Sequence, residues 1–403
     1  MSTSRSLRRV FDTTVGARAR LAGRSISPVG WSLLIAGVCA AIIGHFLGWA
    51  ELTAFGVTAL VVLALAAPFA LGQTELEVEL DVRPPAVTVG QRAAAQITVR
   101  PGGTGPVRSV TMELRVGDTF VEFPVPTLRQ GSEHEEPFVL PTFRRGVITV
   151  GPASSVRGDP LGIVRRTQTW TDEVDLIVHP RTVRLADTGQ GFVRDLEGIA
   201  SNDRSDADIS FHALRTYEPG DDPRHIHWLS TARTGTLMVR QFVDTRRSHL
   251  GLAVDTDPAS YDSNDDFEVG MSIAASLGCR VLADEQEVTC VVGADRVLSD
   301  SRRLFLDSLA RADAVERAAP LGACVAAMMK ASSGLSLAAV ITGARTNLED
   351  LRRATLRFPS GIPVMVIRVD RNSPTTYRPI GNQVLLSVRE IEEFPHLLWA
   401  VSG

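Results

Sequence analysis

Two adjacent apolar runs close to the amino terminus constrain this chain more than any other feature. Within residues 29–49 only the imidazole of His45 is strongly polar, and residues 52–71 carry no charge. Each run has about the 20 residues that a helix needs to cross the roughly 30 Å of hydrocarbon in a membrane. Because only two residues separate the runs, we expect a tight transmembrane hairpin over residues 29–71, in contact with the lipid bilayer.

The segment before the hairpin predicts its orientation. Residues 1–28 form a basic arm with six arginines and a single acid, Asp12. Arginine-rich flanks stay on the cytoplasmic side, and an even number of crossings returns the chain to the side on which it began. We therefore expect a multi-pass protein of the cell membrane with the bulk of the chain in the cytoplasm. A cleaved signal peptide is the alternative, but the first run is long for one and a second follows at once.

Composition excludes several classes of protein. A chain of 403 residues is long enough for two or three domains, and its net charge of −4 does not favour a nucleic-acid partner. The sequence contains neither a GxGxxG nor a Walker motif, so we expect no nucleotide site. The cysteines lie in apolar contexts without the spacing of a zinc site or a disulfide framework; they are Cys39, Cys279, Cys290 and Cys324.

Alternating apolar and polar residues begin at Glu75 and predict antiparallel strands. From Leu76 to Val82 every second residue is aliphatic, which is the pattern of a half-buried strand. Further short apolar runs follow with turn residues between them, and together they predict a small β-sandwich over residues 75–183. Nothing in this segment has a catalytic pattern. Residues 184–210 are rich in Asp, Gly and Ser and predict a linker.

Two arginine pairs in the β segment leave two interpretations open. Arg144-Arg145 and Arg165-Arg166 are either an ordinary solvated surface or a basic rim near the anionic inner leaflet. In the second case each basic residue contributes on the order of 1 kcal/mol of attraction to the membrane. The sequence alone does not separate the two.

Residues 249–403 alternate between strand-like and helix-like segments. This alternation predicts a mostly parallel, doubly wound α/β sheet with helices on both faces. The predicted strands are His249–Asp255, Val288–Val292, Leu335–Thr342, Pro363–Val369 and Gln383–Val388, and the predicted helices are Asp265–Asp284, Ser301–Ala314, Asn347–Phe358 and Glu390–Val401.

Residues 211–248 join the linker to the α/β segment and contain the densest group of charges and aromatic rings. The stretch from Arg215 to Arg233 is RTYEPGDDPRHIHWLSTAR. Asp222 before a proline predicts a helix start, with Ile226, Leu229 and Ala232 on one face. One interpretation is a turn and helix held by Arg–Asp pairs at a domain junction. The other is a catalytic cluster of Asp221, Asp222, His225 and His227.

This stretch resembles the signature of the bacterial "domain of unknown function 58" family. The pattern is R-x-Y-x-P-G-D-D-x-R-x-I-x-W followed by A-R-x-G-x-L-x-V-R. Where the family usually has an aspartate before the tryptophan, this chain has His227. The residues that carry the resemblance are Arg215, Tyr217, Pro219, Gly220, Asp221, Asp222, Arg224, Ile226, Trp228 and Arg233, followed by Gly235, Leu237, Val239 and Arg240.

The α/β segment resembles a von Willebrand factor A domain, whose metal site begins D-x-S-x-S after the first strand. Here Asp255 is kept, while Asp257 and Ala259 stand where the two serines would be. A later strand ends Thr342-Gly343 without the aspartate that often follows such a threonine. The resemblance implies a possible Mg²⁺ site at Asp255 and Asp257. The alternative is that these carboxylates cap the next helix.

We therefore expect a membrane-anchored, non-enzymatic protein-interaction protein. Members of the family that it resembles are typically encoded beside MoxR-type AAA+ ATPases, which implies an AAA+ ATPase partner in assembling or remodelling envelope or other complexes. Two alternatives stay open: a metal-dependent hydrolase that uses the aspartates, and a purely structural membrane protein.

Overall fold

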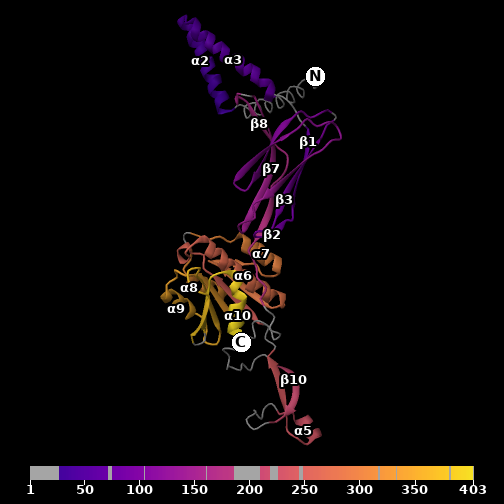
Figure 1. Cartoon of the computed structure of the whole chain (residues 1–403), viewed down its shortest axis with the longest axis vertical. Coiled ribbons are helices and arrows are strands. Elements are labelled where there is room, and N and C mark those ends of the chain that lie inside the picture. The colour runs from indigo at the N-terminus through magenta and orange to yellow at the C-terminus, as the bar shows by residue number, and fades with distance from the viewer. Residues whose placement is uncertain are drawn as a thin grey trace, which may run out of the picture. The chain divides into compact units, whose positions relative to one another are not determined.

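The computed structural model describes residues 27–70, 75–103, 105–159, 161–185, 209–217, 226–244, 248–315, 318–332, 334–380 and 383–402. The chain divides into two compact units, Met1–Val178 and His179–Gly403, so the prediction of a multidomain protein is confirmed. Figure 1 shows the elements of each unit. All but two residues of the predicted basic arm, and most of the predicted linker, lie outside the described residues.

The first unit begins with two helices, α2 (Pro28–Leu47) and α3 (Ala50–Ala70), which pack against each other in opposite directions. The Ser27 hydroxyl caps α2 by accepting a bond from the backbone of Gly30, and Gly48 ends the helix with a left-handed φ of 73°. The helices touch through glycines. A Cβ on Gly56 would lie 2.4 Å from the backbone nitrogen of Ala41.

Among the described residues, α2 is the single helix that is long and apolar enough to cross a membrane. Helix α3 counts as a shorter apolar helix over its described side chains, residues Ala50–Ala66. The structure thus contains one candidate membrane-spanning helix near the amino terminus, and the second predicted span is not established by the same criterion.

The remainder of the first unit consists of two antiparallel sheets. Their buried side chains, such as Ile97 from one and Met112 from the other, belong to a single hydrophobic core. Pleated strands send alternate side chains inward, so β3 is buried at every second position. One sheet contains β1 (Leu76–Arg83), β3 (Ala93–Pro101) and β6 (His134–Leu140); the other contains β2 (Ala86–Thr88), β9 (Val174–His179), β7 (Gly146–Gly158), β4 (Val110–Val116) and β5 (Thr119–Val125), with β8 (Arg165–Thr169) paired to β7.

The second unit contains a seven-stranded mixed sheet in the order β14-β13-β12-β15-β16-β18-β17. The five central strands are parallel and both edge strands are antiparallel. The strands are β12 (His249–Val254), β13 (Glu287–Val292), β14 (Asp295–Val297), β15 (Leu337–Gly343), β16 (Val364–Val369), β17 (Thr376–Ile380) and β18 (Gln383–Val388).

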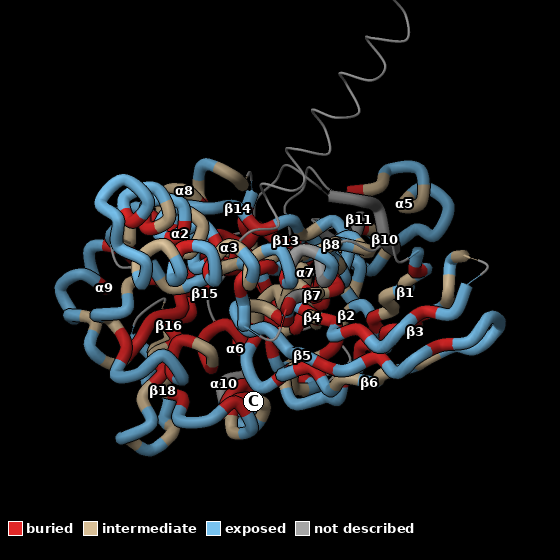
Figure 2. The backbone as a smooth tube through the Cα atoms, turned by 90° about the horizontal axis from the view of Figure 1, so that it is seen from above, coloured by how far each residue is buried: buried red, intermediate tan, exposed pale blue. Residues whose placement is uncertain are grey.

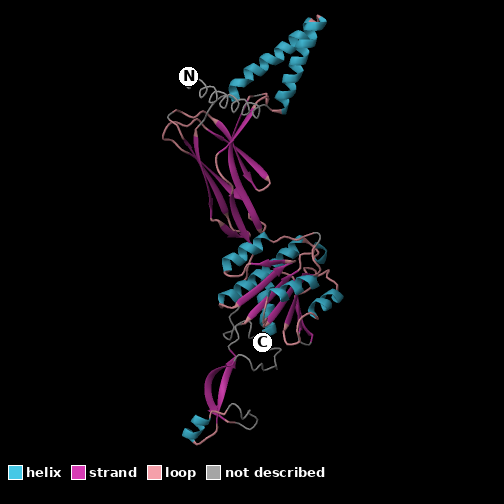
Figure 3. Cartoon of the chain, turned by 180° about the vertical axis from the view of Figure 1, so that it is seen from behind, coloured by secondary structure: helices cyan, strands magenta, loops and turns pink. Residues whose placement is uncertain are grey.

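Helices lie on both faces of this sheet (Figure 3). The sequence of β12 is apolar throughout, and alternation divides it between two cores: Leu250 and Leu252 pack on one side and Ala253 on the other. Figure 2 shows buried residues along β15 and β16 and an exposed outer surface on α9. The helices are α6 (Asn264–Ala283), α7 (Arg302–Arg311) and α10 (Phe394–Ser402) on one face and α8 (Leu321–Ala331) and α9 (Leu348–Thr355) on the other, with short turns η2 (Pro258–Ser260) and η3 (Ile391–Glu393).

An antiparallel pair of strands precedes the mixed sheet in sequence. Strands β10 (Ile209–Thr216) and β11 (Met238–Asp244) pair with a bulge at Phe211, and α5 (Trp228–Thr234) lies between them. The predicted helix start at Asp222 lies outside the described residues; α5 begins at Trp228. Ile226 does not join the helix, since its backbone bridges to Val239. We call β10, α5 and β11 the signature arm.

Candidate functional site

The strand order of the mixed sheet places one pair of residues at its topological switch point. Strand β12 pairs with β13 on one side and with β15 on the other. The strands that follow β12 in sequence therefore lie on both sides of it, and the strand order reverses there. Ligands of open α/β sheets bind beyond the carboxyl ends of the strands at such a point. In this chain those ends are Asp255, directly after β12, and Thr342, the penultimate residue of β15.

Asp255 is buried and uses both carboxylate oxygens. Its Oδ2 accepts a hydrogen bond from the hydroxyl of Thr342 over 2.7 Å, and its Oδ1 accepts from the backbone nitrogen of Asp257 over 3.0 Å. The Thr342 oxygen lies 2.5 Å from Oγ1 of Thr346. These contacts hold together the ends of two strands and the turn after β15, although the residues lie 87 positions apart in sequence.

The following residues continue this network. Asp257 caps η2 because its Oδ1 accepts from the backbone of Ala259 over 2.9 Å. The Tyr261 hydroxyl donates to the backbone oxygen of Asp255 over 2.7 Å and is fully enclosed. Burial and then the charge of Asp255 raise the pKa of Tyr261 well above its ordinary value, so Tyr261 stays a donor.

A buried thiol also lies near this carboxylate. The Cys324 thiol donates to the backbone oxygen of Val254 over 3.5 Å. Burial, followed by the Asp255 charge, raises the pKa of Cys324 to about 12. A thiol held protonated is a poor nucleophile and a poor metal ligand, so Cys324 belongs to the packing of the site.

We tested whether these residues fit a divalent cation. Mg²⁺ prefers about six oxygen ligands, whereas each oxygen of Asp255 already accepts one hydrogen bond and has a single lone pair left. Asp257 is committed to η2, and Ala259 has no hydroxyl. In the described ranges no three His, Cys, Asp or Glu side chains are grouped as a metal site. The residues present therefore fit a hydrogen-bonded strand-end cap, which is the alternative that the sequence left open.

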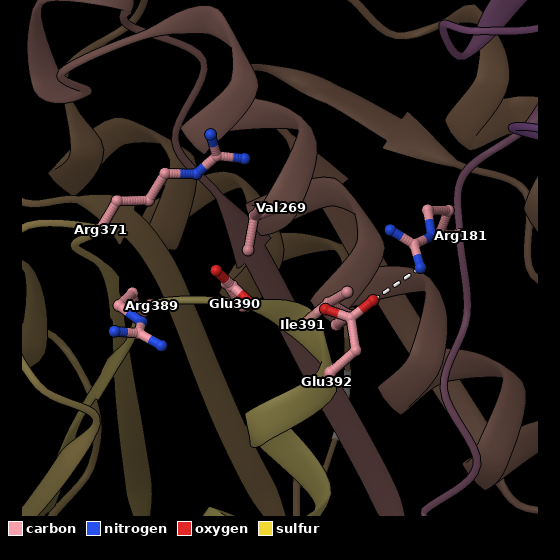
Figure 4. A pocket seen from close by; sticks show the side chains of 7 residues that line it. All are labelled: Arg181, Val269, Arg371, Arg389, Glu390, Ile391 and Glu392. Atoms are coloured by element: carbon pink, nitrogen blue, oxygen red, sulfur yellow. Dashed lines mark hydrogen bonds and ion pairs between the residues drawn. The ribbon is translucent and has the colours of Figure 1, made fainter.

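Two hollows flank the carboxyl edge of the sheet. One, of about 550 Å³, extends from Thr256 and Gly293 to Arg311. The other, of about 600 Å³, lies after β16 and β18 and is shown in Figure 4. Each of its arginines has an acidic partner, so it offers no surplus positive charge; the pairs are Arg181–Glu392 at 2.6 Å, Arg389–Glu393 at 3.0 Å and Arg371–Asp266 at 3.2 Å.

The structure describes only part of the predicted signature. Arg215 and Tyr217 lie at the end of β10, and the Tyr217 amide donates to the backbone oxygen of Leu237 over 2.8 Å. Trp228 and Arg233 lie on α5. Pro219, Gly220, Asp221, Asp222, Arg224 and the alternative catalytic residue His225 lie outside the described residues, so the predicted Asp/His cluster has no described geometry.

His227 is the N-cap of α5. Its Nδ1 accepts a hydrogen bond from the backbone nitrogen of Ser230 over 3.1 Å, and its own amide donates to Met238 over 2.8 Å. An aspartate at the N-cap accepts the same kind of backbone hydrogen bond through a carboxylate oxygen. This explains how His227 can replace the aspartate of the resembled pattern: an acceptor is needed there, and the ring nitrogen supplies it.

Helix α5 turns large apolar side chains toward solvent. It has no buried residue, and the exposed fractions are 67% for Trp228, 63% for Leu229 and 42% for the nearby Leu237. The predicted apolar face of this helix is therefore not a buried face. The backbone nitrogen of Met238 donates to the Thr231 hydroxyl over 3.0 Å, which fixes α5 on β11 and leaves the apolar side chains outward.

Comparison with known families matches a segment that contains both the signature arm and Asp255. Residues 213–359 match the family described as "Protein of unknown function DUF58". The resemblance to the DUF58 family is thereby confirmed for this segment. No curated protein matches the chain significantly. Similar solved structures include a CARDB domain from Pyrococcus furiosus, at 17% identity over 26% of this chain and 93% of that one, with a TM-score of 0.20. The ApaA protein from Bordetella pertussis has 18% identity over 27% and 97%, with a TM-score of 0.19.

The DUF58 match includes both features described above, because it runs from β10 through α9. Asp255 was found from sequence by its place after a buried strand. Its partner Tyr261 and the capping role of His227 were missed, and Thr342 was noted at the end of a later strand but not as a partner of Asp255. The available signal for Thr342 was a hydroxyl at the end of a second parallel strand, which becomes informative once β12 and β15 are known to be neighbours.

Proposed function

We propose that this protein is a membrane-anchored, non-enzymatic adaptor whose DUF58 signature arm binds a partner protein. The observation that carries the proposal is the exposure of Trp228 and Leu229 on α5. Large apolar side chains grouped on a surface are typical of binding sites, and tryptophan contributes more than its share of energy in protein interfaces. Arg233 on the same helix is exposed as well.

The chemistry of the arm indicates the kind of surface that it binds. Trp228 and Leu229 need an apolar pocket, and the Arg233 guanidinium needs acidic groups at its rim. We assign this surface to an AAA+ ATPase of the MoxR type, the class associated with the family. The adaptor would bring that ATPase to the membrane for assembly or remodelling of envelope or other complexes.

The proposal includes a two-pass anchor, formed by α2 and α3, that leaves the rest of the chain in the cytoplasm. The support is the close packing of α2 and α3 through Gly37, Gly44 and Gly56, since small residues let membrane helices approach each other. It also includes a β-sandwich in residues 75–183 and a von Willebrand factor A-like domain in residues 249–403. The β-sandwich is supported by the single core that the two antiparallel sheets share. The von Willebrand factor A-like domain is supported by the switch point after β12.

Co-purification from solubilised membranes tests the function. Tagged wild-type protein should retain a MoxR-type ATPase, and Trp228→Ala should reduce the retained amount at least tenfold while the protein keeps its melting temperature. Trp399→Ala is the matched control, because Trp399 is also 67% exposed but lies on α10 outside the arm. Equal retention by the two variants would contradict a role for the arm.

Two other functions predict different results. A metal-dependent hydrolase using Asp221, Asp222, Asp255 and Asp257 predicts a stoichiometric bound cation and turnover that vanishes in Asp221→Ala or Asp222→Ala variants that still fold. No contact among the described residues favours it. A purely structural membrane protein predicts that Trp228→Ala changes neither binding nor turnover.

A further inference from the structure

The turn between β7 and β8 rests on the base of the helix pair. The backbone nitrogen and hydroxyl of Ser27 both donate to the carbonyl of Ile163, each over 3.0 Å. Ile163 and Val164 form a small apolar cluster with Ala66 and with Leu33 and other helix residues. The turn therefore lies beside the first turns of α2 and the last turns of α3.

The conformation of this turn presents a leucine to solvent. Asp159 holds the loop by accepting bonds from the backbone nitrogens of Leu161 over 2.9 Å and Val164 over 2.6 Å. The neighbours Ile163 and Val164 are buried, but 69% of Leu161 is exposed. If α2 and α3 cross a membrane as proposed above, this exposed leucine lies at the boundary between hydrocarbon and headgroups.

Arginines gather on the strands that lead to the turn. Arg157 on β7 is the direct cross-strand partner of Arg166 on β8, and like charges placed opposite each other are destabilising. Arg108 lies just before β4, and together with Arg166 it lowers the pKa of Arg157, although burial is the larger cause. The three cations are therefore near neighbours.

The acids close to this group already have other partners. Glu113 pairs with Arg165, and the Asp159 carboxylate accepts the two backbone bonds of the turn. Within the described part of the chain neither Arg157 nor Arg108 has a recorded salt bridge. Arg157 is repelled by Arg166 and Arg108, and an external anion beside Arg157 would relieve this repulsion.

Strand geometry places these arginines at the depth of the headgroups. A strand rises about 3.3 Å per residue, so the four residues from Leu161 to Arg157 span at most about 13 Å. The headgroup layer extends roughly 5–7 Å beyond the hydrocarbon on each side. The long arginine side chain spans the remaining distance and can bind a phosphate with two nitrogens.

We infer that the β7–β8 turn is a second membrane contact of this protein, in which Leu161 enters the lipid interface and the cluster of Arg108, Arg157 and Arg166 binds anionic phospholipid headgroups. This inference rests on the proposed anchoring by α2 and α3. In an anionic membrane this contact fixes the orientation of the helix pair relative to the β strands of the first unit. Of the two interpretations of Arg165-Arg166 that the sequence left open, it favours the basic rim.

A depth measurement on the full chain tests this contact. Leu161→Cys, made together with Cys39→Ala, is labelled with bimane; the other cysteines are buried and should not react. The protein is reconstituted into phosphatidylcholine vesicles containing brominated acyl chains, with or without phosphatidylglycerol. Bromine should quench the label strongly in anionic vesicles and weakly in neutral ones, and high salt should reduce the difference.

Charge variants identify the cause. Arg157→Gln with Arg166→Gln should return quenching in anionic vesicles to the neutral level, since each arginine near an anionic surface changes the bound-to-free ratio about fivefold, equivalent to about 1 kcal/mol. Arg92→Gln with Arg144→Gln is the matched control. Both are exposed. Arg144 precedes β7, at the end opposite Arg157, and Arg92 lies near it because Ala93 pairs with Leu140.

Vesicle flotation separates failure of this inference from failure of the anchor. Every variant should float with the vesicles, because the helices remain. Wild-type protein that fails to float contradicts the anchoring itself. Protein that floats but shows the same quenching with and without phosphatidylglycerol contradicts only the second contact. The same holds if the double variant is quenched as strongly as wild type while losing a protein partner, which would make the cluster a protein-binding surface.

Discussion

The hydroxyl of Thr342 donates to Oδ2 of Asp255 across the two strands at which the sheet reverses its order, over 2.7 Å. Because both side chains are buried, water does not replace this bond when it is lost. The pair therefore links the geometry of the switch point to the stability of the whole α/β unit.

Removal of the Thr342 hydroxyl should destabilise this unit. Thr342→Val keeps the shape of the side chain but leaves one carboxylate oxygen of Asp255 without its donor, and bonds to charged groups contribute about 1.5–3 kcal/mol. We expect the free energy of unfolding to fall by about 2 kcal/mol, measured by urea denaturation in detergent. Thr342→Ser is the control, because it keeps the hydroxyl. Equal stability of the valine and serine variants would show that the bond contributes nothing.

Buried thiols should make the α/β unit sensitive to alkali. The pKa of Cys324 rises from 9.0 to about 12 on folding, so between these values the unfolded chain has lost a proton that the folded chain keeps. Ionisation of Cys324 therefore leaves the free energy of unfolding unchanged below about pH 9. Above that pH it lowers the free energy of unfolding by up to about 1.4 kcal/mol per pH unit.

Replacing this thiol isolates its contribution. Cys324→Ala lowers stability at all pH values because it leaves a cavity, and it should also flatten the decline between pH 9 and 12 given by the two pKa values. The pH slope of urea midpoints measured by circular dichroism reports the difference. A slope equal to that of wild type would mean that Cys324 is exposed to solvent in the folded state.

The α/β part of the fold was the most predictable from sequence. The five central strands are continuous apolar runs, and burial on both faces demands such runs. Edge strands β14 and β17 were missed because three to five residues with exposed side chains carry no such pattern. Helix α8 was missed too: its Pro320 cap makes no side-chain bond, so the usual start signal is absent.

The candidate site was only half predictable. Asp255 could be predicted because it comes directly after a strand. The hydrogen bond from Thr342 to its carboxylate could not, because it depends on the pairing of β12 with β15, which joins segments far apart in sequence. Ile226 was assigned to a helix because Asp222-Pro223 is a strong local helix-start signal. The bridge between Ile226 and Val239 is a tertiary contact, and it overrides that signal.

The cap of α5 gives a test of the His227 assignment. His227→Ala removes the acceptor for the Ser230 amide and should destabilise the helix by about 1 kcal/mol. His227→Asp should restore or exceed wild-type stability, because aspartate is a preferred cap and its charge favours a helix start. Hydrogen exchange of peptides that cover α5 measures both effects. If the alanine and aspartate variants exchange alike, His227 is not the cap.

The contact between α2 and α3 should depend on Gly56 more than on its neighbours. A Cβ at this position would lie 2.4 Å from the nitrogen of Ala41 and 2.7 Å from the oxygen of Gly37, both backbone atoms that cannot move alone. Gly56→Leu must therefore separate the helices, at a cost of about 1–3 kcal/mol. Ala54→Leu adds a similar side chain on the exposed face and serves as the control. Separation of the helix pair in increasing SDS, followed by energy transfer between dyes placed on α2 and α3, should begin at lower SDS for Gly56→Leu alone. If the two variants unfold together, the glycine contact does not hold the helices, and the support that it lends to a two-pass anchor is lost.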